Sequence, residues 1–432
     1  MMRVMPSKTA WRLLNPHHAS ARRRARVPHT YNLRDSGTAP GVNISPGCDD
    51  DGWIVPPPVT LSDGTRVQLY KDGEALHAAY DAIAAARHRI CLQSYIFADD
   101  PTGQVFAELL ARKASEGVQV YLIYDSVGSL ASRRDMFRHM QRHGVHIRAF
   151  HPINPLECRY SWRPFNRDHR KILIVDYDMA GLGGLNVGSE YGGSWVAPLG
   201  DSKCAPWRDN AIGIAGPGAR YLLRPFSRMW NYISHGGRIR RAEYIHNLDF
   251  SQGDLAVLAS VPTMSSPLRP FLRKLFREAR QSIQMTMAYF APPDDLIDDI
   301  CRAAKRGVKV QLMLAGEIDV PILLIAARSF YETLLGAGVE IYERGGAILH
   351  AKTLCIDKQI SQIGSTNLDF RSIEYNCEIS ALVKSEELGE QMAELFHNDI
   401  RFARRITLRE WRHRRWQDRF VQWAVNRSRY LL

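Results

Sequence analysis

The chain lacks the features that usually mark a membrane-spanning, disulfide-bonded or zinc-binding protein. Its 432 residues contain no stretch approaching the roughly 20 apolar residues that a transmembrane helix needs. The longest candidate, residues 320–327, contains Pro321 and is expected to form part of a buried element. The seven cysteines are odd in number and show no CxxC spacing. We therefore expect no membrane span, buried free thiols in a reducing compartment, and no disulfide framework or metal site.

Acidic residues are missing from the start of the chain. No aspartate or glutamate precedes Asp35, arginines cluster at residues 22–26, and Gly, Pro, Ser and Asn dominate residues 36–52. Such a segment buries too little apolar surface to offset the entropy lost on ordering, so residues 1–55 are predicted to be a basic, disordered arm. An Arg-rich, acid-poor start is also typical of an organellar transit peptide, and a membrane-touching arm is a third interpretation.

The length and charge of the chain narrow its organisation and its partners. A chain of 432 residues exceeds what one hydrophobic core usually serves, which predicts two domains or two fused repeats. The net charge of +12 and the pI near 9.4 indicate a polyanionic partner, either nucleic acid or an anionic membrane surface. Charge alone does not choose between the two.

Strands alternate with helices from about residue 67, which predicts an α/β fold. The sequence EGVQVYLIYD at residues 116–125 returns as RGVKVQLMLA at residues 306–315, and a helix and an apolar strand precede each copy. We therefore predict a first repeat over residues 56–240 and a second over residues 241–400. Each is expected to form a parallel or mixed β-sheet flanked by helices.

Each predicted repeat carries the same polar pattern around a short apolar strand. The first copy is His169, Lys171 and Asp176, followed by Gly183, Gly184 and Asn186; the second is His350, Lys352 and Asp357, followed by Gly364, Ser365 and Asn367. Residues two apart share one face of a strand, so the histidine and lysine of each copy point the same way. The aspartate of each copy lies an odd number of positions from its histidine. Strand parity therefore turns Asp176 and Asp357 away from the site and gives them structural roles.

A carboxylate follows each copy at an equivalent place. Asp209 opens the apolar strand in WRDNAIGIAG, and Glu378 opens the matching strand in NCEISALVK. A carboxylate behind an imidazole fixes its tautomer and favours the imidazolium form. We assign this orienting role to Asp209 and Glu378.

These residue types together suit phosphoryl transfer. Lysine cations and asparagine amides donate to phosphodiester oxygens and stabilise the charge that develops in the transition state without a metal. One neutral imidazole can attack phosphorus while the other, protonated, serves the leaving and incoming hydroxyl groups. Phosphate contacts are expected from Asn186 and Asn367, with Ser365 and Ser189 as weaker candidates. A single His-x-Lys is commonly surface decoration, but two full copies are hard to explain by packing.

The doubled pattern, HxKxxxxD followed by GGxN or GSxN, resembles the phospholipase D superfamily and, within it, the bacterial cardiolipin synthases. The similarity runs from about residue 69 to residue 396 and rests on four stretches: NRDHRKILIVD…GGLNVGSEY, PWRD, AYFAPP and LHAKTLCID…GSTNLDFRS…NCE. The resemblance implies two repeats around a pseudo-twofold axis with the active site at their contact, and no metal or cofactor. It implies transfer of a phosphatidyl group from one phosphatidylglycerol to another, releasing glycerol.

The resemblance also implies roles for individual residues. It places all six motif residues in the catalytic group: His169, Lys171, Asp176, His350, Lys352 and Asp357. This conflicts with strand parity for the two aspartates. In the superfamily the N-terminal histidine is usually the nucleophile, which favours His169, with His350 as acid and base. Longer cardiolipin synthases carry N-terminal transmembrane helices, so this chain resembles the shorter, peripheral branch, in which phosphatidylethanolamine is an alternative donor.

The last segment, residues 401–432, is predicted to be a basic amphipathic helix. Trp416, Phe420, Trp423 and Leu431 fall on one face and arginines cover much of the rest, as in helices that lie in an anionic membrane surface. The alternative is that the tryptophan face packs on the second repeat. The expected partners are an anionic phospholipid surface, on the cytoplasmic face of a bacterial inner membrane, and phosphatidylglycerol as substrate.

Two other functions remain as alternatives. One is hydrolysis of phospholipid or of nucleic acid. The nuclease-like members of the superfamily carry one motif copy and dimerise, so two copies in one chain argue against nucleic acid. The other is a non-enzymatic membrane-binding protein, against which the intact motifs argue. Access for lipid headgroups is expected past Tyr95, Phe97, Tyr289 and Phe290; the oligomeric state is not predicted.

Overall fold

The computed structural model describes residues 52–153, 166–192, 207–236, 253–260 and 267–431. Nearly all of the predicted N-terminal arm lies outside these ranges, as do Cys48, Cys158 and Cys204. The described cysteines, Cys91, Cys301, Cys355 and Cys377, are buried and free, as the sequence predicted. Within the described ranges, no helix combines the length and the apolar character needed to cross a bilayer.

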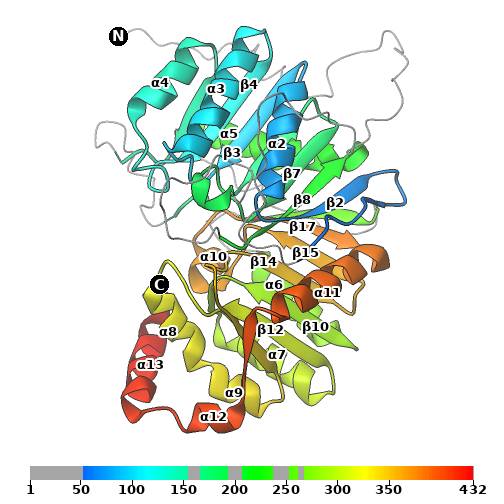
Figure 1. The fold of residues 1–432 in the computed structure, drawn as a ribbon, viewed down its shortest axis with the longest axis vertical. Coiled ribbons are helices and arrows are strands. Elements are labelled where there is room, and N and C mark those ends of the chain that lie inside the picture. The colour runs from blue at the N-terminus through cyan, green and yellow to red at the C-terminus, as the bar shows by residue number, and fades with distance from the viewer. Residues whose placement is uncertain (1–51, 154–165, 193–206, 237–252, 261–266, 432) are drawn as a thin grey trace. The chain divides into compact units, whose positions relative to one another are not determined.

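The first repeat contains an eight-stranded mixed sheet in the order β1-β2-β8-β7-β6-β3-β4-β5 (Figure 1). Strands β3, β4 and β5 are parallel, and β6, β7 and β8 continue the sheet in antiparallel fashion. The strands are β1 (Val59–Thr60), β2 (Arg66–Lys71), β3 (Arg89–Ser94), β4 (Gln119–Asp125), β5 (His146–Phe150), β6 (Ile172–Val175), β7 (Met179–Gly183) and β8 (Asn210–Ala215). The helices are α2 (Glu74–Ala85), α3 (Pro101–Ser115), α4 (Arg134–Arg142) and α5 (Leu223–Ser234).

The second repeat contains another eight-stranded sheet, in the order β18-β13-β12-β10-β14-β15-β17-β9. Its strands are β9 (Leu255–Ala259), β10 (Ser282–Met287), β12 (Lys309–Ala315), β13 (Glu340–Arg344), β14 (Lys352–Ile356), β15 (Ile360–Gly364), β17 (Ile379–Lys384) and β18 (Ala403–Ile406). The helices are α6 (Leu268–Glu278), α7 (Asp294–Lys305), α8 (Pro321–Ser329), α9 (Tyr331–Gly336), α10 (Phe370–Glu374) and α11 (Glu386–Ile400). A separate pair joins β11 (Phe290–Ala291) to β16 (Leu368–Asp369).

Seven strands of one sheet correspond to seven strands of the other. The order β2-β8-β7-β6-β3-β4-β5 matches β9-β17-β15-β14-β10-β12-β13, with the same parallel and antiparallel partners. The fold is therefore α/β with two similar repeats, each a mixed sheet flanked by helices, as predicted.

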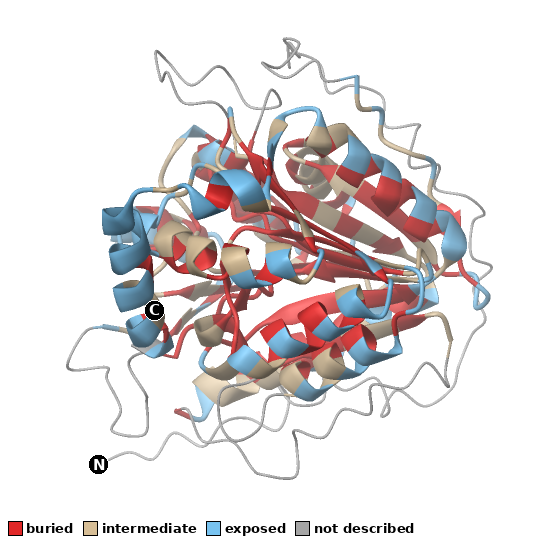
Figure 2. Ribbon diagram, turned by 90° about the horizontal axis from the view of Figure 1, so that it is seen from below, coloured by how far each residue is buried: buried red, intermediate tan, exposed pale blue. Residues whose placement is uncertain are grey.

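The burial pattern explains why these segments form these elements. The central strands β3 and β14 are buried along their whole length, as expected of near-continuous apolar runs covered on both faces. The flanking helices turn buried faces toward the sheets and exposed faces outward (Figure 2). Local signals set the ends of helices: Asp100 caps α3 by accepting a hydrogen bond from the Gly103 N–H (2.9 Å), and Pro101 occupies the first position.

The motif aspartates lie at the far ends of the strands that follow the lysines. Asp176 has φ of 47° in the turn between β6 and β7, and its carboxylate accepts from the backbone N–H groups of residues 87, 88 and 89 (2.7–2.8 Å). Asp357 does the same for residues 280, 281 and 282 (2.7–2.9 Å). Each aspartate lies seven positions after its histidine, at the other end of a short strand, which places the two roughly 20 Å apart. Their position agrees with strand parity and does not support placing them in the catalytic group.

These hydrogen bonds predict that replacing a motif aspartate lowers the stability of the fold without a comparable loss of catalytic activity. In Asp357→Ala, three backbone N–H groups at the start of β10 lose a charged acceptor, and we expect the free energy of unfolding to fall by about 2 kcal/mol or more. Chemical denaturation measures this change. Turnover per folded molecule should stay within about tenfold of wild type, since single-site effects remote from the reacting groups are modest. A large fall in turnover at unchanged stability would return Asp357 to the catalytic group.

The C-terminal segment differs from the prediction of one helix over residues 401–432. Its first part is β18, which pairs antiparallel with β13, so the second sheet extends beyond residue 400. Two helices follow, α12 (Leu408–Arg412) and α13 (Trp416–Ser428). The four residues of β18 are too few to show a strand periodicity, and the pairing with β13 decides their conformation.

Candidate active site

Two short backbone ladders join the repeats at the motif histidines. The His169 N–H donates to the Cys377 carbonyl (3.0 Å), and the Cys377 N–H donates to the Arg167 carbonyl (2.8 Å). The equivalent ladder has the His350 N–H donating to the Arg208 carbonyl (2.7 Å). Each ladder thus ties a histidine of one repeat to the residue directly before the carboxylate of the other repeat.

The carboxylates consequently pair crosswise with the imidazoles. Nδ1 of His169 lies 3.1 and 3.2 Å from the two carboxylate oxygens of Glu378. Nδ1 of His350 lies 2.6 Å from Oδ2 of Asp209. All four side chains are buried. With Nδ1 committed to a carboxylate, Nε2 is the ring nitrogen of each histidine that is available for reaction. The sequence predicted both carboxylates as orienting groups but not that each serves the other repeat.

The residue after β15 and its equivalent after β7 differ in size, in keeping with the different lengths of the two acidic side chains beside them. Ser365 follows β15, and its hydroxyl donates to Glu378 while accepting the Ile379 N–H (3.0 Å). Gly184 holds the equivalent place after β7, where a Cβ would collide with the carboxylate of the shorter Asp209. Ser365 is therefore a positioning residue for Glu378, and phosphate binding by its hydroxyl stays a prediction.

The two motif lysines, Lys171 and Lys352, lie beside the histidines and are buried among polar groups. Nζ of Lys171 donates to the His169 carbonyl (2.8 Å) and lies 5.3 Å from the centre of the Tyr95 ring. Lys352 donates in the same way to the His350 carbonyl. Burial lowers the pKa of Lys171 to about 7 and that of Lys352 to about 8. Lys352 also lowers the pKa of Lys171, and both lysines lower the pKa of His169 and of His350, so the cations of the two repeats lie near both imidazoles.

The charges around the imidazoles act in opposite directions. Burial and the lysine cations lower the pKa of both His169 and His350. Burial raises the pKa of Asp209 to about 6. Burial also acts to raise the pKa of Glu378, but His169 and Lys171 outweigh it and lower that pKa. At neutral pH both imidazoles are accordingly neutral and both carboxylates ionised, while Lys352 is mostly protonated and Lys171 partly so.

The motif asparagines hold the strand-end loops in equivalent ways. Oδ1 of Asn186 accepts the Ile96 N–H (3.0 Å), and Oδ1 of Asn367 accepts the Tyr289 N–H (3.3 Å). These bonds use the oxygen of each side-chain amide and leave its NH₂ group for another partner. The NH₂ group of Asn186 donates to the Tyr191 hydroxyl (2.8 Å). Phosphate binding by the asparagine NH₂ groups stays a prediction. Ser189, by contrast, bonds Thr102 and packs at the start of α3.

Aromatic rings surround the two imidazoles unequally. Tyr95 makes an edge contact with His169 (centroids 5.1 Å apart). His350 is enclosed by Trp207 (5.1 Å), Tyr191 (5.5 Å) and Tyr289 (6.4 Å). The reactive groups of the two repeats are therefore arranged symmetrically, whereas the aromatic residues around them are not. Of the four residues predicted to border the entrance, Tyr95 and Tyr289 contact the histidines, whereas Phe97 and Phe290 are core residues, a correction to that prediction.

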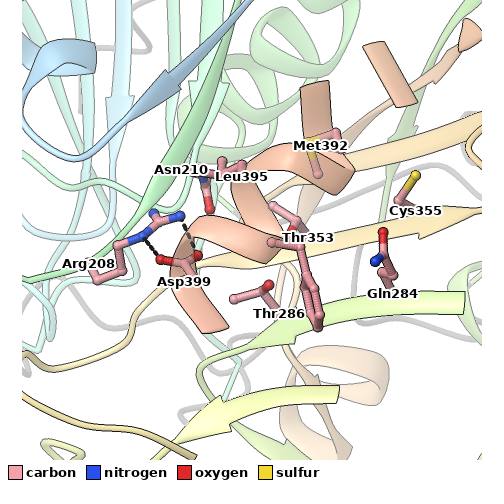
Figure 3. A pocket seen from close by; sticks show the side chains of 10 residues that line it. Arg208, Asn210, Gln284, Thr286, Thr353, Cys355, Met392, Leu395 and Asp399 are labelled. Atoms are coloured by element: carbon pink, nitrogen blue, oxygen red, sulfur yellow. Dashed lines mark hydrogen bonds and ion pairs between the residues drawn. The ribbon is translucent and has the colours of Figure 1, made fainter. Parts of the chain in front are cut away.

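A buried ion pair supports the Asp209 side of the site (Figure 3). The Arg208 guanidinium binds both carboxylate oxygens of Asp399 on α11 (2.8 and 2.7 Å). The Asp209 N–H donates to the carboxylate of Asp72 (2.7 Å), which also lies near Arg208 (3.5 Å). Because the carbonyl of Arg208 receives the His350 N–H, this pair fixes both members of the His350–Asp209 couple. Sequence reasoning singled out PWRD but gave Arg208 no role, and Asp399 carried no signal at all.

Neighbouring polar groups do not form a metal centre. Within the described residues, no cluster of three or more His, Cys, Asp or Glu side chains is placed to hold an ion. The Arg208–Asp399 pair does border a cavity of about 10 Å³, also lined by Thr286 and Thr353, which is room for one water molecule.

Comparison with known proteins identifies the family. A family model described as "Cardiolipin synthase, PLD-like domain" matches residues 80–191 and 272–400. Cardiolipin synthase 1 of Staphylococcus epidermidis is 33% identical over 353 residues, which cover 80% of this chain and 70% of that protein. The chain belongs to the cardiolipin synthase family. Cardiolipin synthase of Halalkalibacterium halodurans, another relative, is 31% identical over 373 residues, covering 84% of this chain and 71% of the relative.

Solved structures share the fold of this cardiolipin synthase family member. Phosphatidylserine synthase of Haemophilus influenzae has a TM-score of 0.62 at 16% identity, covering 85% of this chain and 95% of that chain. Polyphosphate kinase of Porphyromonas gingivalis has a TM-score of 0.53 at 15% identity, covering 84% and 52%. At these identities the likeness concerns the fold alone. The family membership confirms the resemblance seen in the doubled motif and makes the protein a phosphatidyltransferase of the phospholipase D superfamily.

Proposed function

We propose that the protein makes cardiolipin by moving a phosphatidyl group from one phosphatidylglycerol to the free hydroxyl of another, with release of glycerol. The observation that carries this proposal is the crosswise pairing of His169 with Glu378 and of His350 with Asp209. Family membership supplies the lipid class. The pairing supplies two imidazoles, each with a free Nε2, in one site flanked by the two motif lysines.

In the first half of the reaction, Nε2 of His169 attacks phosphorus and the bond from phosphorus to the glycerol oxygen breaks. The bound phosphodiester brings a negative charge between the lysines, and this charge raises the pKa of the neighbouring imidazoles. His350 can then be protonated and give its Nε2 proton to the departing glycerol oxygen. Glu378 stabilises the positive charge that builds on His169, and the lysines stabilise the charge on the phosphoryl oxygens.

The second half reverses these roles. Nε2 of His350 takes the proton from the hydroxyl of the acceptor phosphatidylglycerol, whose oxygen attacks phosphorus. The bond between phosphorus and His169 breaks, and cardiolipin leaves. His169 is then neutral again, and His350 again carries a proton, as it did at the start of the first half. Phosphatidylethanolamine in place of the first phosphatidylglycerol would follow the same steps with ethanolamine as leaving group.

The pKa values predict a bell-shaped dependence of kcat/KM on pH. As pH rises through about 7 and then about 8, Lys171 and Lys352 lose the charges that bind the phosphate, so kcat/KM falls. As pH drops below about 6, Asp209 is protonated and no longer supports the His350 imidazolium. Arginine keeps its charge throughout this range, so Lys171→Arg should move the alkaline limb to higher pH, whatever its effect on the maximal rate. An alkaline limb unchanged by Lys171→Arg would contradict this assignment.

Lipid analysis tests the proposed reaction. The protein is incubated with vesicles of phosphatidylglycerol labelled in the headgroup glycerol and in an acyl chain. We expect one glycerol released for each cardiolipin formed. Phosphatidic acid as the only labelled lipid product would instead show hydrolysis, and no turnover would overturn both. Adding phosphatidylethanolamine and measuring released ethanolamine determines the donor.

We further propose that the protein works peripherally, at the cytoplasmic face of a bacterial inner membrane. Both substrates and the product of the proposed reaction are bilayer lipids, and the chain carries a net charge of +12. A cationic protein gains affinity at the surface of an anionic leaflet. Fractionation of cells after a high-salt wash tests this: release into the wash is expected, and retention that only detergent reverses would contradict a peripheral location.

A further inference from the structure

We propose that α13, together with the loops that follow β4 and β12, forms one surface that docks on an anionic phospholipid bilayer and presents the active-site entrance to it. The inference rests on the proposed function for its choice of lipid. The docking surface is defined by three exposed aromatic residues of α13 and by four exposed aliphatic residues of the two loops and of the first turn of α8: Trp416, Phe420, Trp423, Val127, Leu130, Val320 and Ile322.

Helix α13 exposes its aromatic face to solvent. Trp416 is 72% exposed, Phe420 60% and Trp423 56%, and their spacing of four and three residues puts them on one face. The same helix meets the protein through Gln422, which is buried, and through Val425 and Asn426, which are half-buried. Figure 2 shows the helix that ends at the C-terminus almost entirely in the colour of exposed residues. This is the reverse of a helix that packs on a core, so the interpretation of a tryptophan face packed on the second repeat is wrong.

Ion pairs hold α13 in this orientation. Arg429, just after the helix, binds Asp294 (2.6 Å), and Arg414, just before it, binds Glu332 (3.0 Å) and Gln422 (3.0 Å). The helix lies beside α8 along one edge of the second repeat (Figure 1). Because polar contacts fix the helix, its aromatic face remains presented outward.

The loop after β4 brings exposed aliphatic residues to the His169 side of the entrance. Val127 is 41% and Leu130 69% exposed. Between them, Ser129 bonds the backbone of the Tyr95 segment (3.2 Å), and Tyr95 contacts the imidazole of His169. The loop is thus linked to the imidazole of His169 through Tyr95.

The loop after β12 does the same on the His350 side. Asp319 accepts a hydrogen bond from the hydroxyl of Tyr289 (2.8 Å), and Tyr289 contacts His350. Val320 and Ile322 follow directly and are 36% and 40% exposed. Since β4 and β12 are equivalent strands, the two repeats place exposed aliphatic residues at matching positions on either side of one entrance.

The end of α13 reaches the same region. Tyr430, in the turn after the helix, makes an edge contact with Phe370 of α10 (5.0 Å), which begins three residues after Asn367. Phe370 in turn contacts Tyr375, which is 39% exposed. Helix α8, which α13 accompanies, begins at the loop that carries Val320. The C-terminal end of α13 therefore lies near α10, and the helix runs beside the one that starts at the Val320 loop.

Charge selects an anionic bilayer over the other possible occupants. Residues 401–432 contain ten arginines against Glu410 and Asp418. A second copy of this surface, or the basic N-terminal arm, would bring like charges together. Exposed tryptophans flanked by arginines are the composition of helices that lie in an anionic lipid interface.

Vesicle binding of the full-length chain tests the proposal. The variant Trp416→Ser/Trp423→Ser should bind phosphatidylglycerol vesicles at least about tenfold more weakly than wild type. Arg415→Gln/Arg419→Gln should lose affinity for these vesicles and show a weaker dependence on salt. Ile54→Ser removes an exposed aliphatic side chain (83% exposed) from the segment packed along α11 and serves as the matched control, which should bind normally.

The outcomes separate this proposal from the proposed reaction. His350→Ala, whose turnover is expected to be strongly reduced, should bind vesicles as wild type does, so binding is measured with little catalysis. Unchanged vesicle binding by the tryptophan variant overturns the docking surface. So does a wild-type dimer that becomes monomeric in that variant, since the face would then be a protein interface. Equal binding of wild type to phosphatidylcholine vesicles overturns the choice of an anionic surface. If binding depends on the tryptophans but no lipid forms cardiolipin, the reaction fails and the docking surface stands.

Discussion

His169→Ala should abolish phosphatidyl transfer while leaving the protein folded. If His169 is the nucleophile, its loss removes the covalent route altogether, and a fall in kcat of about 10⁴-fold or more is expected. His350→Ala removes the acid and base, with a smaller expected fall of about 10²–10⁴-fold. Cardiolipin formation from phosphatidylglycerol measures both. His397→Ala, which removes an exposed histidine on α11, should keep wild-type turnover.

An activated donor separates the two roles. p-Nitrophenolate leaves without needing a proton, so a phosphatidyl p-nitrophenyl ester should restore the first step in His350→Ala and release a burst of p-nitrophenol. The same ester should give no burst with His169→Ala. The reverse pattern would exchange the two histidines' roles. A burst from both variants would contradict a shared site.

The same ester should also distinguish the two orienting carboxylates, because each of them acts on the histidine of the other repeat. Glu378→Gln and Asp209→Asn keep the shape of the side chain but remove the charge, and each should lower kcat by about 10²–10⁴-fold. Since Asp209 supports His350, the p-nitrophenyl ester should largely rescue Asp209→Asn. It should not rescue Glu378→Gln, which supports His169. Asp299→Asn alters another fully buried carboxylate, on α7, and controls for general destabilisation.

The rescue pattern bears on the pairing whichever histidine attacks. Asp209→Asn must behave like His350→Ala, and Glu378→Gln like His169→Ala. If each carboxylate instead behaved like the histidine of its own repeat, the crosswise pairing would be contradicted.

Much of this arrangement could be predicted from the sequence because the motif is doubled. Two copies of His-x-Lys on short strands fix which side chains share a face, and the repeat alignment pairs Asp209 with Glu378. Strand parity also predicted that Asp176 faces away from the site. In the structure its carboxylate accepts hydrogen bonds from backbone N–H groups outside the site. These predictions depend on local periodicity, which a sequence shows directly.

The remaining features arise between segments distant in the chain. The link from Arg208 to Asp399 spans 191 residues, and no periodicity marks it. The exchange of partners, His169 with Glu378, depends on how the two sheets meet rather than on either motif. The role of Ser365 follows from the extra methylene of Glu378 compared with Asp209, which makes room for a hydroxyl that Gly184 lacks. The outward aromatic face of α13 depends on ion pairs that hold the helix from the polar side.

The most direct test of the shared site is a measurement of the histidine side-chain ¹⁵N resonances. Spectra of wild type, Glu378→Gln and Asp209→Asn are compared, with His169→Ala and His350→Ala to assign the two rings among 15 histidines. The account predicts that Glu378→Gln moves the Nδ1 resonance of His169 and leaves that of His350 nearly unchanged, and that Asp209→Asn does the opposite. Resonance changes confined to the histidine of the same repeat would contradict it.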